Sequence, residues 1–150
     1  MTTDRRLALW AGVFYLATFI TSIPALALKT PLLSGEPEPA LAAWGVVLEI
    51  TLAFTCVGTA VAILPIARRV SETLAVGFVT SRVVEAGVIL SGALAVLALI
   101  EVGGSSPAAP ALIELNDAAF LLGPAFMSSI NAFLLGSIML RGRLVPRIIP

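Results

Sequence analysis

The sequence contains no histidine and a single cysteine, Cys56. Without histidine the chain cannot build a Ser-His-Asp triad, an HExxH zinc site or a histidine-ligated haem. A single cysteine excludes an internal disulfide and any CxxC motif. A metal site would have to consist of oxygen ligands alone, which suit Mg²⁺ or Mn²⁺. We expect no cofactor and no metal, and we assign no catalytic residue.

Charge is also scarce. Charged residues make up 12% of the chain and hydrophobic residues 59%, whereas soluble domains average about 25% and about 45–50%. The mean hydropathy is +1.05, and a soluble protein of this size could not bury so much apolar surface. The formal net charge is zero, which does not indicate a nucleic-acid partner. The expected partner of this surface is the lipid bilayer.

Long apolar runs organise the chain. A membrane-spanning helix needs about 20 predominantly apolar residues, and the sequence offers four such runs. It therefore predicts one all-α membrane domain over residues 1–150, a polytopic helical bundle with four transmembrane helices in two hairpins. The expected spans are residues 7–28, 40–66, 73–100 and 111–140.

Prolines and glycines mark the expected helix ends. Lys29–Pro39 and Glu101–Pro110 contain several of these residues and are predicted loops. Pro24 predicts a kink or an early end of the first helix, and Pro65 with Arg68-Arg69 predicts the end of the second. The first run could also be a signal peptide ending at Ala25-Leu26-Ala27. It is longer than the usual apolar region of about 7–15 residues, so we favour a span.

The cations outside the apolar runs predict an orientation. If the spans alternate, only Lys29 falls on one side, next to the acidic residues of the two longer loops. The other side carries Arg5, Arg6, Arg68, Arg69, Arg141, Arg143 and Arg147. By the positive-inside rule both termini are cytoplasmic. We expect a multi-pass protein of the bacterial cytoplasmic (inner) membrane.

Arg82 and Glu85 lie inside the third apolar run. A charge near the bilayer centre costs about 2.5–3.5 kcal/mol on insertion scales, so both residues require partners. Their i, i+3 spacing places them on one helical face, where they can pair. This face also carries Phe78, Ser81, Ile89, Gly92 and Val96. The alternatives are snorkelling of Arg82 to the headgroups and pairing of Arg82 with Glu49 or Asp117 of neighbouring helices.

The predicted intramembrane polar cluster consists of Glu49, Arg82, Glu85, Asp117 and Asn131. Glu49 either reaches interfacial water or faces the bundle interior, where it could take up a proton. Asp117 and Asn131 share a face of the fourth run, where Pro124 and Gly123 predict a kink. Asn131 is expected to bond a neighbouring helix, and Asn116-Asp117 could instead be a capping region near the surface.

A secondary polar stripe consists of Tyr15, Thr18 and Ser22 on the first run and Ser128 on the fourth. For the residues of the first run we favour hydrogen bonding between helices.

Three segments resemble a family of bacterial integral membrane proteins known as domain of unknown function 4386. They are Arg5–Leu26 (RRLALWAGVFYLATFITSIPAL), Ser81–Ala86 (SRVVEA) and Asn116–Pro150, which ends in RLVPRIIP. The resemblance implies a membrane location but no activity, substrate or cofactor. Members usually continue past such a tail into two more helices, so the chain resembles a truncated or shortened member.

Three classes of function remain. We favour a structural or assembly role in which buried charges fix helix pairing, with a second copy or a partner membrane chain as an open alternative. The second class is a small module that binds or transports a solute or proton through Glu49, Glu85 and Asp117 around Arg82. The third is a membrane enzyme with a carboxylate-only site, which we disfavour because no DxxD or ExxxD pair occurs on any helix.

Overall fold

The computed structural model describes residues 3–143, and within this range every regular element is helical. The elements are α1 (Thr3–Leu33), α2 (Pro39–Val70), α3 (Glu72–Val102), α4 (Ala109–Phe120), the π-helix η1 (Leu121–Met127) and α5 (Ser128–Arg141). The last three are continuous and form one span, so residues 3–143 contain four helices long and apolar enough to cross a membrane. The predicted fold class, an all-α membrane bundle, is confirmed.

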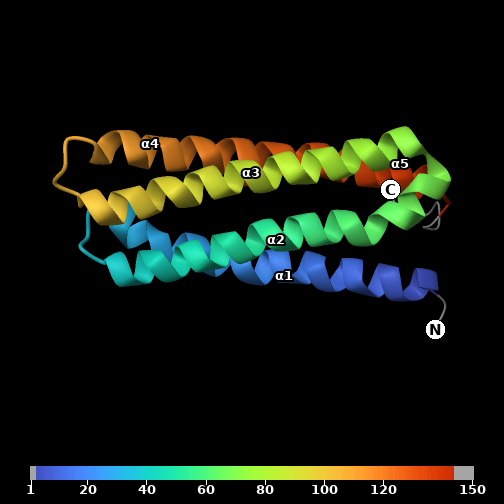
Figure 1. The fold of residues 1–150 in the computed structure, drawn as a ribbon, viewed down its shortest axis with the longest axis horizontal. Coiled ribbons are helices and arrows are strands. Elements are labelled where there is room, and N and C mark those ends of the chain that lie inside the picture. Colours follow the sequence, from blue (N-terminus) through green and yellow to red (C-terminus); the bar gives the residue numbers. More distant parts are fainter. Residues whose placement is uncertain (1–2, 144–150) are drawn as a thin grey trace.

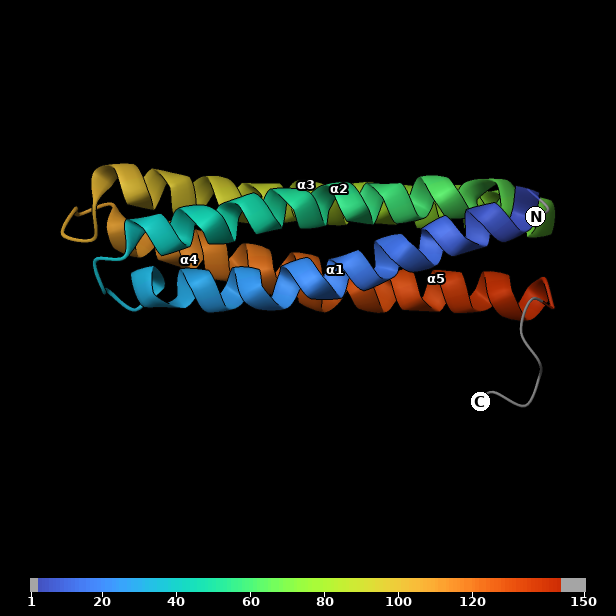
Figure 2. The same cartoon turned by 90° about the horizontal axis from the view of Figure 1, so that it is seen from below.

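The helices run side by side along the long axis of the molecule (Figure 1). α1 packs mainly against α2, α2 against α3, and α3 against α4, η1 and α5. The start of α1, the α2–α3 turn and the end of α5 lie at one end of the bundle, and the α1–α2 and α3–α4 loops lie at the other (Figures 1 and 2). We name these the arginine end, after Arg68, Arg69 and Arg141, and the loop end.

The first two helices are longer than predicted, because they continue through three prolines that the sequence interpretation treated as helix ends or loop residues. α1 continues through Pro24 and Pro31 to Leu33, and α2 continues through Pro65 to Val70. The early end, one of the two outcomes predicted at Pro24, was wrong. The second helix ends at Val70, directly after Arg68-Arg69, which with Pro65 were predicted to end it. The loop predicted from Lys29 was also wrong, because Lys29 belongs to the last turns of α1. Prolines are tolerated inside membrane helices, where neighbouring groups compensate for the lost backbone hydrogen bond.

Glycine, serine and proline mark the ends that the structure does show. Pro39 begins α2 at a position where its missing N–H has no helical partner in any case. Ser71 caps α3, since its Oγ accepts a hydrogen bond from the backbone N–H of Leu74 at 3.4 Å. Gly103 follows α3 with a φ of 78°, a conformation that favours glycine.

The apolar core forms three clusters along the axis. The cluster at the loop end joins α2 and α3 to Leu32 of α1 and Ala109 of α4, and the cluster at the arginine end joins them to Ile138 of α5. The middle cluster contains buried residues of α2 and α3 only, such as Cys56 and Ile89. α1 contributes a buried residue to the loop-end cluster alone, and the fourth span contributes to both end clusters but not to the middle one, near which the polar residues lie.

Close helix contacts at mid-height and towards the loop end depend on glycine. A Cβ added at Gly45 would lie 2.7 Å from Lys29 Cγ and 3.0 Å from the carbonyl oxygen of Ala25. A Cβ added at Gly92 would lie 3.0 Å from Ala119 Cβ. These distances are too short for a side chain, so glycine lets α1 approach α2 and lets α4 approach α3. This is the contact that small residues make possible between membrane helices.

The kink expected at Pro124 is a π-helical segment. Residues of η1 form i to i+5 hydrogen bonds, so this segment turns less per residue than an α-helix. Positions before η1 are therefore rotated relative to positions after it. The inner face before η1 contains Asn116 and Ala119, and the inner face after it contains Asn131 and Ile138. Asp117 would share the face of Asn131 in an uninterrupted α-helix, but here it is exposed.

Candidate functional site: two buried polar clusters and a cleft

Arg82, Glu85 and Asn131 form a buried network near the middle of the bundle, which we name the Arg82 cluster. Arg82 Nη1 donates to Glu85 Oε2 at 2.6 Å, and Asn131 Nδ2 donates to the same oxygen at 2.7 Å. Arg82 is only 4% exposed and Glu85 only 3%. The ion pair predicted from the i, i+3 spacing is therefore present, and Asn131 makes the expected hydrogen bond between helices. Arg82 does not snorkel to a headgroup.

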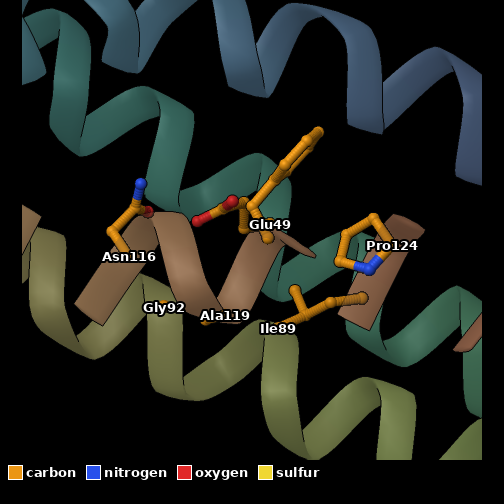
Figure 3. A pocket seen from close by; sticks show the side chains of 7 residues that line it. Glu49, Ile89, Gly92, Asn116, Ala119 and Pro124 are labelled. Atoms are coloured by element: carbon orange, nitrogen blue, oxygen red, sulfur yellow. The ribbon is translucent and has the colours of Figure 1, made fainter. Parts of the chain in front are cut away.

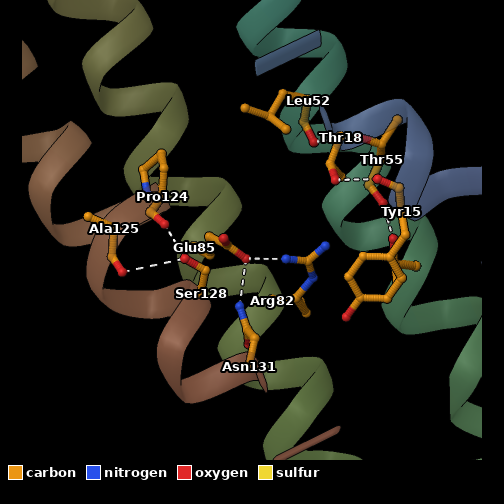
Figure 4. Close-up of polar contacts among 11 residues, drawn as sticks. Tyr15, Thr18, Leu52, Thr55, Arg82, Glu85, Pro124, Ala125, Ser128 and Asn131 are labelled. Atoms are coloured by element: carbon orange, nitrogen blue, oxygen red, sulfur yellow. Dashed lines mark hydrogen bonds and ion pairs between the residues drawn. The ribbon is translucent and has the colours of Figure 1, made fainter. Parts of the chain in front are cut away.

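The Arg82 guanidinium also faces the first helix. Its Cζ lies 5.4 Å from the centre of the Tyr15 ring, a cation–π distance. Figure 4 shows the guanidinium between Glu85 and Tyr15. The charge of α3 is thus directed across the bundle towards α1.

A cleft of about 270 Å³ lies beside this cluster. Its wall combines polar side chains from three spans with apolar side chains, and includes Tyr15, Thr18, Phe19, Ser22, Leu52, Cys56, Arg82, Glu85, Ile89, Pro124 and Ser128. Every residue of the secondary polar stripe lines this cleft. The hydrogen bonds predicted between helices are wrong for Thr18, because its hydroxyl donates to the Tyr15 carbonyl of its own helix at 2.7 Å.

Ser128 belongs to the cleft through the irregular backbone of the fourth span. Its hydroxyl donates to the carbonyl oxygen of Pro124 inside η1 (Figure 4). Irregular backbone occurs at membrane depth where it is covered by protein or lines a cavity, and π-helical turns often occur at functional sites.

Only one of the three guanidinium nitrogens of Arg82 has a partner among the described residues. Nε and Nη2 are both buried and form no hydrogen bond, and Oδ1 of Asn131 is in the same condition. Such groups are costly in a low-dielectric interior. A buried polar group without a partner therefore calls for an explanation. Arg82 is also one of the residues that line the adjoining cleft.

Lys29, Glu49 and Asn116 form a second buried network nearer the loop end, which we name the Lys29 cluster. Lys29 is 1% exposed. Its ammonium group pairs with Glu49 Oε1 and donates to Asn116 Oδ1 at 3.0 Å. Glu49 thus faces the bundle interior rather than interfacial water, with a side chain 13% exposed. This cluster joins α1, α2 and α4.

A cavity of about 10 Å³ adjoins the Lys29 cluster, enough for about one water molecule. It is lined by Glu49, Gly92, Asn116 and Ala119, and shares Ile89 and Pro124 with the larger cleft. Figure 3 shows the Glu49 carboxylate directed towards Asn116 in this region. Glu49 Oε2 is buried here without a partner among the described residues.

The single polar cluster predicted from the sequence is therefore two clusters. Glu49 belongs to the Lys29 cluster, while Arg82, Glu85 and Asn131 form the other. Asp117 belongs to neither interior, since it is exposed and its carboxylate accepts only a 3.2 Å hydrogen bond from Asn116 Nδ2. The π-helical rotation explains this correction, because it places Asn116 rather than Asp117 on the inner face.

Lys29 and Asn116 are site residues that the sequence interpretation missed. Pro31 and the neighbouring turn residues concealed Lys29, because they read as a loop. A signal was nevertheless present, since Tyr15, Ser22 and Lys29 follow one another at intervals of seven residues. This spacing keeps them on one side of a helix. This spacing predicts an inward-facing Lys29 only if Pro24 and Pro31 are assigned to the helix.

The carboxylates do not converge on one point. Glu49 and Glu85 are each engaged by their own cation, and Asp117 faces outwards. Within residues 3–143, no three acidic or sulfur side chains come close enough to hold a metal ion. The arrangement offers instead a positively charged hydrogen-bond donor beside a partly apolar cleft.

Four apolar helices with paired charges buried between them define a polytopic membrane helical bundle. The chain belongs to the family described as Domain of unknown function (DUF4386), whose sequence profile matches residues 10–150. The resemblance seen in the sequence is thereby confirmed. No curated protein and no solved structure matches the chain.

Proposed function

We propose that this protein is a binding module that holds a small solute within the membrane, in the cleft beside the Arg82 cluster. One observation carries the proposal: Arg82 is 4% exposed, lines a cleft of about 270 Å³, and forms hydrogen bonds to the described residues through one of its three guanidinium nitrogens. Ionisable residues inside membranes commonly mark ligand or ion pathways. A partly apolar cleft with few polar groups is also the usual form of a small-molecule site.

The native cysteine offers a direct test. Cys56 lines the cleft, so a small neutral thiol reagent that enters the cleft should modify it. We expect methyl methanethiosulfonate, applied to the protein in native membranes, to modify Cys56 as measured by intact mass.

The matched control moves the thiol by one helical turn. Ala60 is fully buried in the apolar cluster with Phe78 and Ile138 and does not line the cleft. The double variant Cys56→Ala with Ala60→Cys should therefore react at least about tenfold more slowly, since burial without an access path protects a thiol. Equal reactivity of the two cysteines, or none at Cys56, would contradict a solute-accessible cleft.

A structural or assembly role is the second candidate, favoured by the Lys29 cluster. Its hydrogen bonds and ion pair join three of the four spans. Neither Lys29 nor Glu49 lines the larger cleft. Buried ion pairs are sometimes retained because they specify one arrangement of helices. This role would be supported if substitution of Lys29 disrupts the pairing of the helices while reagents still enter the cleft beside the Arg82 cluster.

We also propose that the protein lies in the bacterial cytoplasmic membrane with both termini in the cytoplasm. Support comes from the basic residues at the arginine end and from Glu36, Glu38 and Glu101 at the loop end. Lys29 no longer counts against this distribution, because it is buried in α1. Arg147 lies outside the described residues. An alkaline phosphatase fusion after Arg143 should be inactive, and an active fusion would reverse the orientation.

A further inference from the structure

The unpartnered nitrogens of Arg82 form one edge of the guanidinium group. Nη1 carries the hydrogen bond to Glu85, whereas Nε and Nη2 have no partner among the described residues. The N–H groups of Nε and Nη2 point in parallel along this edge. This pair of donors matches the two oxygens of a carboxylate in a bidentate contact.

The charges around the cleft favour a ligand with one negative charge. Among the residues that line it, Arg82 is the cation, and it is already paired with Glu85 at 2.6 Å. The second buried cation, Lys29, is engaged by Glu49 and Asn116 and does not line the cleft. A phosphate dianion would therefore face Glu85 with a single guanidinium to balance it, whereas a carboxylate brings one charge.

The cleft and a second, apolar hollow share Tyr15 in their walls. The hollow has a volume of about 240 Å³ and lies between α1, α2 and α5. Its wall includes Ala8 and Ala11 of α1, Ile66 of α2, and Leu135 and Met139 of α5. A ligand whose carboxylate meets Arg82 can place an apolar body here.

The cleft also opens to the outer surface of the bundle. Phe19 lines it and is 65% exposed, in the middle of α1. At this depth the surroundings of the helix are lipid, so a ligand that enters past Phe19 comes from the bilayer. Such a ligand needs enough apolar surface to partition into lipid.

From these observations we propose that the cleft binds an organic monocarboxylate with an apolar body, taken from the bilayer. Its carboxylate is held by Nε and Nη2 of Arg82, and its body lies in the hollow beyond Tyr15. This inference rests on the proposed binding function and adds the chemical class of the ligand. The carboxylate defines this class of ligand, because a neutral molecule of the same shape would leave Nε and Nη2 of Arg82 without an acceptor.

The test compares three eight-carbon probes with the protein in lipid nanodiscs, using empty nanodiscs as the blank. Octanoate should bind saturably. Octanamide, the neutral analogue, and octyl phosphate, the more highly charged one, should each bind at least about tenfold more weakly, since a charge-assisted bidentate contact is lost or opposed.

Variants at the cluster separate charge from geometry. Arg82→Lys keeps the positive charge but lacks the two parallel N–H donors of the guanidinium group, so octanoate should bind about tenfold more weakly. Glu85→Gln removes the competing negative charge and should tighten octanoate binding. Unchanged octanoate binding in Arg82→Lys, or weaker binding in Glu85→Gln, would overturn the assignment of the carboxylate to Arg82.

A second pair of variants tests the hollow and does not touch the ion pair. Ala11→Leu would fill the hollow and should weaken octanoate binding. Gly12→Leu is the matched control, because a Cβ at Gly12 meets nothing within 4 Å and the position does not line the hollow. Equal effects of the two variants would show that the ligand body lies elsewhere.

The outcomes distinguish this inference from the proposed function. If octyl phosphate or octanamide binds most tightly and the binding still depends on Arg82, the binding function stands and the carboxylate class is wrong. If none of the three probes binds while Cys56 remains reactive, the carboxylate inference fails and the accessible cleft remains. If Cys56 is inert as well, both proposals fail.

Discussion

At the scale of single residues, both buried cations are paired within the chain but in different ways. Lys29 meets a carboxylate of one helix and an amide of another, so its partners come from α2 and α4. Arg82 meets a carboxylate one turn away on its own helix, which leaves part of its guanidinium free. The first arrangement is suited to hold helices together, and the second to receive a further group.

Substitution of Lys29 should be strongly destabilising. Lys29→Met leaves Glu49 buried without its cation, and breaking a buried ion pair in this way costs about 3 kcal/mol or more. The free energy of unfolding, measured by titration of mixed micelles with sodium dodecyl sulfate, should fall by this amount.

Two further variants identify the cause. Lys29→Met with Glu49→Leu should recover much of the loss, because replacing both members of a buried pair by apolar residues is often nearly neutral. Asp4→Asn breaks the exposed pair with Arg69 and should cost less than about 1 kcal/mol. A Lys29→Met cost as small as that of Asp4→Asn would show that the Lys29 cluster does not hold the helices.

The contact that sequence spacing predicted in full is one between local partners. Arg82 and Glu85 are three positions apart on one helix, so spacing alone was sufficient to predict their contact. For Asn131 the sequence predicted a hydrogen bond to a neighbouring helix but not its partner Glu85, which lies 46 positions away. Lys29 could not be assigned from spacing, because its partners lie 20 and 87 positions away. No local pattern specifies which acid of a neighbouring helix reaches a given lysine.

At the scale of elements, helical periodicity predicted α3 correctly and the fourth span incorrectly. All seven residues assigned to the inner face of α3, from Phe78 to Val96, are buried. In the fourth span the same procedure assigned Asp117 to the inner face, but η1 rotates the preceding segment and exposes it. Pro124 signalled a disturbance, but a proline does not by itself specify whether the helix bends or forms a π-helical segment.

Glycine at the α3–α4 contact should be required for stability. A larger side chain at Gly92 would collide with Ala119, and overpacking of this kind costs about 1–3 kcal/mol. Gly92→Leu should therefore lower the free energy of unfolding in the same titration. Gly87→Leu, on the same helix at a position where a Cβ meets nothing within 4 Å, is the control and should be nearly neutral. Equal losses in the two variants would contradict the close contact seen between α3 and α4.

At the scale of the whole molecule, α2 and α3 form the centre and the outer spans are less covered. In their most apolar stretches, 44% of the residues of α2 and of α3 are buried, against 17% in α1 and in the fourth span. The cleft is lined by residues of all four spans, and the hollow by residues of α1, α2 and α5. Composition was sufficient to predict four spans, but the cleft depends on how all four spans are spaced, which no single run of sequence encodes.

The most direct measurement of the central claim is the NMR signal of the Arg82 Nε–H group. Protein labelled with ¹⁵N-arginine in nanodiscs should give one Nε–H resonance that is absent from Arg82→Lys and that shifts downfield on addition of octanoate but not of octanamide. The remaining arginines of the described chain are exposed, and their resonances should not move. A resonance of Arg82 that is unaffected by saturating octanoate, or shifts confined to the exposed arginines, would contradict a carboxylate site at this residue.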